Sequence, residues 1–269
     1  MASTGTWTHA LASIGAAPVR WLAGWWRIVE FGAIVLVLFM SPSSYRRGNG
    51  IGPALARHVY LDTAPILGWF TTLCALLTLV LTRILVVTAY SYGLSQYALE
   101  MVIRVLMLEL IPLTAALFVA LRCTIPNGAA LSEMRRLGRF DALLSQGIDP
   151  VTREVLPRVV AGVFSTITLA ALSCVVALAL AYLAVYGPTT AGIEAYTRMF
   201  GHVFSPAVGL IFVLKTLFFS LAVSVIPMAS ALYDLEGDGS RASAALQGLV
   251  RMFAVLLLIE AVSLMGNYY

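Results

Sequence analysis

The chain has 269 residues, of which 60% are hydrophobic and 11% charged, with a formal net charge of +4. Its mean hydropathy of +0.91 lies outside the range of ordinary soluble domains and indicates an integral membrane protein. The basic residues are almost all arginine and are spread among the connections, which gives little support to nucleic-acid binding. Cys74, Cys123 and Cys174 have no paired spacing, so neither a disulfide framework nor a zinc site is expected.

The N-terminal segment predicts an uncleaved helix at the membrane surface. Basic residues precede a short apolar run, but no small-residue cleavage pattern follows it. Trp21, Trp25 and Trp26 alternate with charged residues, as in helices that lie among lipid headgroups. We therefore expect residues 1–53 to form a cytoplasmic segment with an interfacial elbow helix, and residues 54–269 to form the transmembrane domain.

Five later stretches are long enough to cross the hydrocarbon core, which requires about 20 mostly apolar residues. The fold class expected is therefore an all-α integral membrane protein, with the interfacial helix plus about five transmembrane helices. The predicted crossings are residues 64–90, 97–121, 159–186, 206–232 and 249–268.

The distribution of arginine predicts the orientation of these crossings. The connection between the second and third crossings is rich in arginine, whereas the connection before it has none and the one after it has only Arg198. Since Arg and Lys in short loops stay preferentially in the cytoplasm, the Arg-rich connection is predicted to be cytoplasmic. Arg46, Arg47, Arg57 and Arg241, which flank other crossings on the same side, agree. The N-terminus is then cytoplasmic and the C-terminus periplasmic, in a bacterial inner membrane.

The Arg-rich connection contains a predicted amphipathic helix over residues 131–144. Apolar residues recur there every three or four positions, with charged residues between them. Two interpretations remain open, namely a helix that rests on the membrane surface and a cytoplasmic helix that docks a partner protein. The apolar positions are Leu131, Met134, Leu137, Phe140 and Leu144.

Charged side chains inside crossings are costly and usually mark function or a specific partner. Arg104 and Glu109 are five residues apart, about 140° around an α-helix, so each should need another partner. Glu109 and Lys215, the only lysine, lie at similar depths, which predicts an ion pair between them. Arg83, Arg104 and Glu260 fall in the outward halves of their helices, where water, a headgroup or a periplasmic partner could reach them. For all five residues, pairing that fixes helix register and a role in lipid handling both remain open.

No catalytic motif stands out in the chain. It lacks a phosphate-binding G-x-x-x-x-G-K-[ST] loop, an H-E-x-x-H motif and a G-x-S-x-G elbow, and its three histidines are scattered. We therefore expect neither intrinsic catalysis nor a metal site.

A set of short motifs resembles the MlaE/YrbE family, permeases of Mce-associated lipid ABC transporters, over roughly residues 60–269. Ala130 and Gly138 stand where that family usually has glutamates, which implies a divergent member. The matching motifs are, in order, the run from Glu109 to Pro112, then Arg122, Met134, Asp141-Ala142-Leu143, Gly147-Ile148-Asp149-Pro150, Leu156-Pro157-Arg158 and Ala161-Gly162.

The resemblance implies a permease subunit that moves phospholipid, or a related lipid, between the inner membrane and a periplasmic Mce-domain protein, and so serves outer-membrane lipid homeostasis. ATP and Mg would be bound by a separate cytoplasmic ATPase, with no cofactor on this chain. A second permease subunit, identical or paralogous, would complete a dimer, and a lipid headgroup would lie near Arg83 and Arg104. The alternative is a noncatalytic membrane scaffold that anchors a periplasmic lipid-binding assembly. The candidate ATPase-coupling residues are Leu131, Met134, Leu137, Arg139, Asp141 and Asp149.

Overall fold

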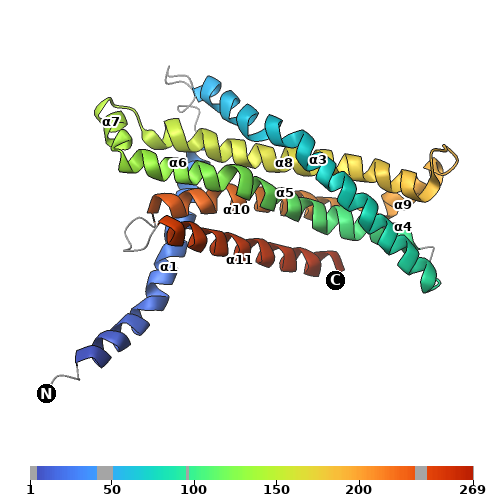
Figure 1. Ribbon diagram of the computed structural model, residues 1–269, viewed down its shortest axis with the longest axis horizontal. Coiled ribbons are helices and arrows are strands. Elements are labelled where there is room, and N and C mark those ends of the chain that lie inside the picture. Colours follow the sequence, from blue (N-terminus) through green and yellow to red (C-terminus); the bar gives the residue numbers. More distant parts are fainter. Residues whose placement is uncertain (1–4, 41–50, 95–96, 234–240, 269) are drawn as a thin grey trace.

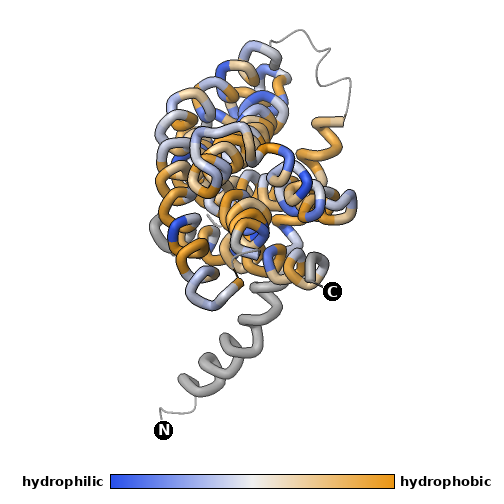
Figure 2. Tube along the Cα trace, turned by 90° about the vertical axis from the view of Figure 1, so that its right-hand side faces the viewer, coloured by the Kyte–Doolittle hydropathy of each residue, from blue (hydrophilic) through white to orange (hydrophobic). Residues whose placement is uncertain are grey.

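The computed structural model describes residues 5–40, 51–94, 97–233 and 241–268, and this part of the chain is helical with no strand. Six of its helical segments are long and apolar enough to cross a membrane, and hydrophobic residues predominate along them (Figure 2). The predicted fold class, an all-α integral membrane protein, is therefore confirmed. The six segments are Ala23–Met40, Gly52–Ser91, Leu99–Arg136, Val151–Tyr186, Pro206–Tyr233 and Leu246–Gly266.

The five later segments run side by side along the long axis and alternate in direction, as predicted (Figure 1). The second crossing is built from several consecutive pieces, and the third from two. In chain order, the helical elements of the five crossings and their connections are α3 (Ile51–Ser91), α4 (Ala98–Val102), η2 (Ile103–Leu110), α5 (Ile111–Val119), η3 (Ala120–Thr124), α6 (Ile125–Arg136), α7 (Arg139–Ser145), η4 (Val151–Val155), α8 (Leu156–Tyr186), α9 (Ile193–Val203), α10 (Pro206–Tyr233) and α11 (Arg241–Tyr268).

Several helices extend further than the sequence predicted, and always toward the Arg-rich end. The first crossing begins at Ile51 instead of residue 64, and the second continues to Arg136 instead of residue 121. The additional turns contain the polar and charged residues that hydropathy assigned to loops. The helices therefore continue through sequence that is too polar for the hydrocarbon core.

The N-terminal helix α1 (Gly5–Met40) crosses the other helices at a steep angle instead of running parallel to them (Figure 1). Ile28, Phe31 and Val35 are buried on one of its faces, and the ring of Phe31 packs edge-on against Tyr233 with centroids 6.0 Å apart. The helix thus lies across the Arg-rich end of α10. Ala23–Met40 is long and apolar enough to span a membrane, and the interfacial position of this helix stays a prediction.

Three stretches of π-helix share a local cause, because a proline follows each of them by two positions. The segments η2, η3 and η4 precede Pro112, Pro126 and Pro157 respectively. Proline has no N–H to donate and its ring collides with the carbonyl four residues earlier. The backbone ahead of each proline therefore widens to i→i+5 pairing, a geometry that often accompanies functional sites.

A further helix, α9, covers the end of the bundle opposite the Arg-rich end (Figure 1). It was missed because it lies in the short connection between two crossings. The hydroxyl of Tyr196 donates a hydrogen bond of 2.9 Å to the carbonyl of Leu178. Burial, with the neighbouring Tyr186, raises the pKa of Tyr196 to about 12, so this hydroxyl remains a donor at physiological pH.

The close packing of α8 against α10 depends on Gly162. A Cβ placed there would lie 2.6 Å from Ser224 Oγ and 2.9 Å from Thr124 Cγ2. We therefore expect Gly162→Ala to lower the thermal unfolding temperature, because overpacking a fitted core costs about 1–3 kcal/mol. Tryptophan fluorescence of the purified protein in detergent would measure it.

The matched control is Gly209→Ala in α10, where nothing lies within 4 Å of the added Cβ and alanine favours the helix. An unfolding temperature for Gly162→Ala as high as that of Gly209→Ala would contradict the packing described here.

Candidate functional site: an intramembrane charge cluster

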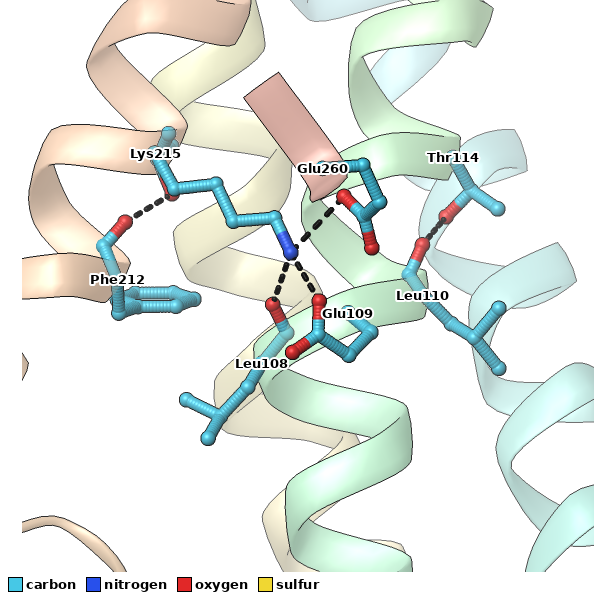
Figure 3. Close-up of polar contacts among 8 residues, drawn as sticks. Leu108, Glu109, Leu110, Thr114, Phe212, Lys215 and Glu260 are labelled. Atoms are coloured by element: carbon cyan, nitrogen blue, oxygen red, sulfur yellow. Dashed lines mark hydrogen bonds and ion pairs between the residues drawn. The ribbon is translucent and has the colours of Figure 1, made fainter. Parts of the chain in front are cut away.

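Lys215 lies inside the bundle with its side chain only 1% exposed. Its Nζ donates to the carbonyl of Leu108 at 2.9 Å and to a carboxylate oxygen of Glu109, and it lies 2.9 Å from Oε2 of Glu260. The three partners come from η2 and α11, so the lysine of α10 joins three segments (Figure 3). The Phe219 ring centroid lies 5.7 Å from the ammonium. We call Glu109, Lys215 and Glu260 the charge cluster.

Pro112 explains how a backbone carbonyl becomes available to the lysine. In an α-helix the Leu108 carbonyl would accept from the N–H of residue 112, but proline has none. The carbonyl instead accepts from Lys215. The sequence from Leu108 to Pro112 therefore supplies two acceptors, a freed carbonyl and the adjacent Glu109 carboxylate.

The predicted ion pair between Glu109 and Lys215 is confirmed, and the cluster has a third member that the sequence did not predict. Glu260 was assigned to the outward half of its helix, within reach of water or a headgroup, but it pairs with Lys215. Glu260 does lie in the outward half of α11, and what the sequence interpretation missed is that Lys215, which it placed near the middle of its crossing, lies equally far outward on α10. Counted from the Arg-rich ends of α10 and α11, Lys215 and Glu260 lie at nearly the same depth, roughly 27 Å and 28.5 Å at 1.5 Å per residue.

The structure does not bring Arg104 and Arg83 to the charge cluster. Arg104 pairs with Glu100 one turn earlier, with Nε 3.0 Å from Oε1, so its partner is local rather than on another helix. The predicted angle of 140° between Arg104 and Glu109 assumed α-helical geometry. In the π-helical η2, residues five apart lie near one face, yet Arg104 pairs with Glu100. Arg83 is exposed on α3 and forms no ion pair with any residue that the structure describes.

The predicted amphipathic helix is interrupted. Instead of one helix over residues 131–144, α6 ends at Arg136 and α7 begins at Arg139. Gly138 between them has φ of +70°, a left-handed conformation that favours glycine and ends helices. The result is a helix–turn–helix at the Arg-rich end (Figure 1). We call its turn and second helix, residues 137–145, the coupling turn.

The candidate coupling residues divide into exposed and buried groups. Leu131 is fully buried within this chain, so it is not accessible to a partner protein. Met134 is half-buried and its sulfur lies 3.8 Å from Arg158 Nη2. Leu137, by contrast, is 58% exposed, and Arg139 and Asp141 beside it are exposed as well.

The remaining candidate, Asp149, has a local structural role. Its carboxylate accepts hydrogen bonds of 3.1 Å from the backbone N–H groups of Val151 and Thr152, which otherwise have no partner at the start of a helix. Further along the same helix, Arg158 donates to Glu154 Oε2 at 3.0 Å. Asp149 is exposed, but its hydrogen bonds to the helix start already explain why an aspartate lies here, with no need for contact with a partner protein.

The coupling turn is attached to the rest of the bundle through α6. The guanidinium of Arg135 donates to the carbonyl of Leu232 near the end of α10, and Gly128 lies where a Cβ would be 3.1 Å from the Pro227 carbonyl. Helix α6 is therefore packed tightly along α10, the helix that carries Lys215.

A scan against protein-family models matches the permease MlaE family over residues 55–265. The chain belongs to the MlaE permease family. This membership makes it a membrane-embedded permease subunit of an ABC transporter, and it confirms the family inferred from the sequence motifs. The matched range includes the whole charge cluster and the coupling turn of this permease. A comparison with curated proteins gave no significant match.

Removing one member of the buried pair should strongly destabilise the permease. We expect Lys215→Met to cost about 3–5 kcal/mol, because it leaves two carboxylates without their counter-ion. Glu109→Gln should cost less, because Glu260 still faces the lysine. In a double-mutant cycle by thermal unfolding, the Glu109→Gln/Lys215→Met variant should lose less stability than the sum of the single variants.

Glu194→Gln in α9 is the control, since its ion pair with Arg198 is almost fully exposed and should contribute little. Strict additivity in the Glu109/Lys215 cycle would contradict a direct contact.

Proposed function

We propose that this MlaE permease moves phospholipid, or a related lipid, between a bacterial inner membrane and a periplasmic Mce-domain protein, driven by a separate cytoplasmic ATPase that binds ATP and Mg. The observation that carries the proposal is the coupling turn. It exposes Leu137, flanked by Arg139 and Asp141, at one end of an otherwise apolar bundle. An exposed leucine framed by opposite charges suits a protein partner that contributes an apolar pocket and a polar rim.

Movement of the coupling turn has a physical route into the membrane. Helix α6 packs along α10 through Arg135 and Gly128, and η3, α5 and η2 continue the same chain toward Glu109. Force on the turn would therefore bear on the helices that meet at Lys215. The three π segments provide places where such a helix can change its pairing.

The lipid would occupy the surface between two permease subunits, identical or paralogous, with its acyl chains on apolar helix faces. Arg83 supports this placement because it is exposed on α3 without an ion-pair partner in the described chain, so a phosphate headgroup could pair with it. Arg104, already paired with Glu100, is less available than expected.

The function is tested by affinity purification of the tagged permease from its native membrane in mild detergent. We expect a cytoplasmic ATPase and an Mce-domain protein to co-purify, and phospholipid to alter the ATPase activity of the complex. Leu137→Asp should abolish ATPase recovery with little change in thermal stability, because this side chain is exposed in the isolated permease.

Ile193→Asp is the matched control, a similarly exposed apolar residue on α9 at the other end, and it should leave ATPase recovery unchanged. Recovery of neither partner with the wild-type chain would remove the main support for the proposal. Assembly of the complete complex without lipid transfer between vesicles would instead favour a noncatalytic scaffold.

The proposed orientation places the coupling turn in the cytoplasm, α9 in the periplasm, and the C-terminus on the periplasmic side. We expect a membrane-impermeant maleimide to label Thr190→Cys in spheroplasts and to leave Ser145→Cys unlabelled until the membrane is opened. The wild-type chain controls for its native thiols, of which Cys74 and Cys123 are buried. Labelling of Ser145→Cys but not of Thr190→Cys in sealed spheroplasts would show that the topology is the reverse of the one proposed.

A further inference from the structure

Asp62 of α3 is joined to the part of the second crossing where α6 begins. Its Oδ2 accepts a hydrogen bond of 3.0 Å from Asn127 Nδ2 in α6, and its backbone carbonyl accepts one of 3.3 Å from Cys123 Sγ in η3. The side chains of Asp62 and Asn127 are both half-buried. One residue thus contacts two successive segments of the second crossing, so Asp62 links this crossing to the first.

The turn of α3 that contains Asp62 is short of a backbone hydrogen bond. Pro65 lies inside α3 and has no N–H to donate to the carbonyl of Leu61, four residues earlier. Asp62 and Thr63 lie within this turn. Thr63 fixes it to α8, because its hydroxyl forms a buried hydrogen bond of 2.7 Å with that of Ser165. The turn is therefore a weak point of α3 that two neighbouring helices hold.

Helix α6 begins at a weak point as well. Asn127 follows Pro126, and the π-helical η3 comes directly before α6. The next residue, Gly128, lies where a Cβ would be 3.1 Å from the Pro227 carbonyl of α10. Two neighbouring residues of α6 thus contact two different helices, so a displacement of α6 acts on α3 as well as on α10.

Helix α6 also connects this contact to the coupling turn. Its 12 residues span about 18 Å, and the coupling turn follows its last residue, Arg136. The proline of α6 lies in its first turn, so the rest of the helix is regular and moves as a unit. A push on the coupling turn therefore arrives at Asn127.

We propose that Asp62 is a positioning residue of the transport cycle, which passes a displacement of α6 to the Arg-rich end of α3 through its hydrogen bond with Asn127. Helix α3 bends in the turn from Leu61 to Pro65, with Thr63 fixed to α8 as the pivot. Residues 51–60 then move together with the coupling turn. The inference rests on the proposed function, since it gives the first crossing a part in the movement that the ATPase would drive.

Substitutions at the two positions separate the hydrogen bond from the charge of Asp62. Asn127→Asp places two carboxylates opposite each other, whereas Asp62→Asn/Asn127→Asp restores one donor and one acceptor in exchanged positions. Asn127→Ala removes the donor without adding a charge. Asp62→Asn keeps an oxygen acceptor for Asn127 but removes the charge, with which Arg158 of α8 also interacts electrostatically.

Pulsed electron paramagnetic resonance on the purified full-length permease measures the contact without a partner protein. Spin labels on Ala56→Cys and Ser145→Cys, both exposed positions, report the distance between the end of α3 and the coupling turn. The permease with its native thiols alone controls for background labelling.

Asn127→Asp and Asn127→Ala should each raise the population of altered distances about tenfold, the factor that corresponds to the loss of one hydrogen bond to a charged group. Asp62→Asn and Asp62→Asn/Asn127→Asp should both keep the wild-type distribution of distances, because each retains a donor opposite an acceptor.

Lipid transfer by the reconstituted complex tests the role in transport. Asn127→Asp should lose most of the lipid transferred per ATP hydrolysed, because α6 then moves without α3, and Asp62→Asn/Asn127→Asp should restore it. Thr72→Val is the control on α3, since the exposed hydroxyl of Thr72 donates within its own helix, to the Gly68 carbonyl at 2.9 Å. It should change neither measurement.

Three outcomes would overturn the proposal. Distances in Asp62→Asn/Asn127→Asp as altered as those in Asn127→Asp would show that residues 62 and 127 are not in direct contact. Equally altered distances in Asp62→Asn would assign the effect to the charge and Arg158. Altered distances with unchanged lipid transfer per ATP would make the contact purely structural. Failure of the transport proposal would appear instead in the wild type, as an ATPase that does not co-purify, and would leave the measured distances unaffected.

Discussion

A buried ammonium constrains the rest of this bundle. Helices in a membrane are not pressed together by the hydrophobic effect, because lipid tails are as apolar as leucine, so packing and polar contacts must position them. Lys215 needs oxygen acceptors wherever it lies, and the chain places them on two other segments, at Leu108 and Glu109 and at Glu260. Sliding or rotating any of the three would leave a charge without its partner, so the cluster defines their relative register.

The prolines make that arrangement possible. Pro112 frees the Leu108 carbonyl and widens the helix before it, and both effects serve the lysine. Pro126 and Pro157 have the same local effect at the Arg-rich end. The second crossing is thus irregular at its polar site and again where it leaves the apolar core. Residues that weaken a helix in isolation are here placed where the altered backbone is used.

Sequence reasoning succeeded where the physical signal was strong and local. Hydropathy located the five crossings, and equal depth identified the partners Glu109 and Lys215, because long apolar runs and rare charges are unambiguous. It failed where boundaries mattered. Placing Lys215 near the middle of its crossing hid the depth that it shares with Glu260, and a single left-handed glycine, Gly138, divided a helix that periodicity alone predicts as continuous. The local pairing of Arg104 with Glu100 was missed because the calculation considered only Glu109 as a neighbour.

The great length of α3 has a mechanical implication. Its 41 residues correspond to about 61 Å of helix, whereas a hydrocarbon core is about 30 Å thick. Oriented near the membrane normal, a helix of this length projects beyond the headgroup regions as well, since these bring the bilayer to about 40–45 Å. Pro65 lies inside this helix and removes one of its backbone hydrogen bonds, so a displacement of the projecting end would reach the membrane through a point at which the helix can bend.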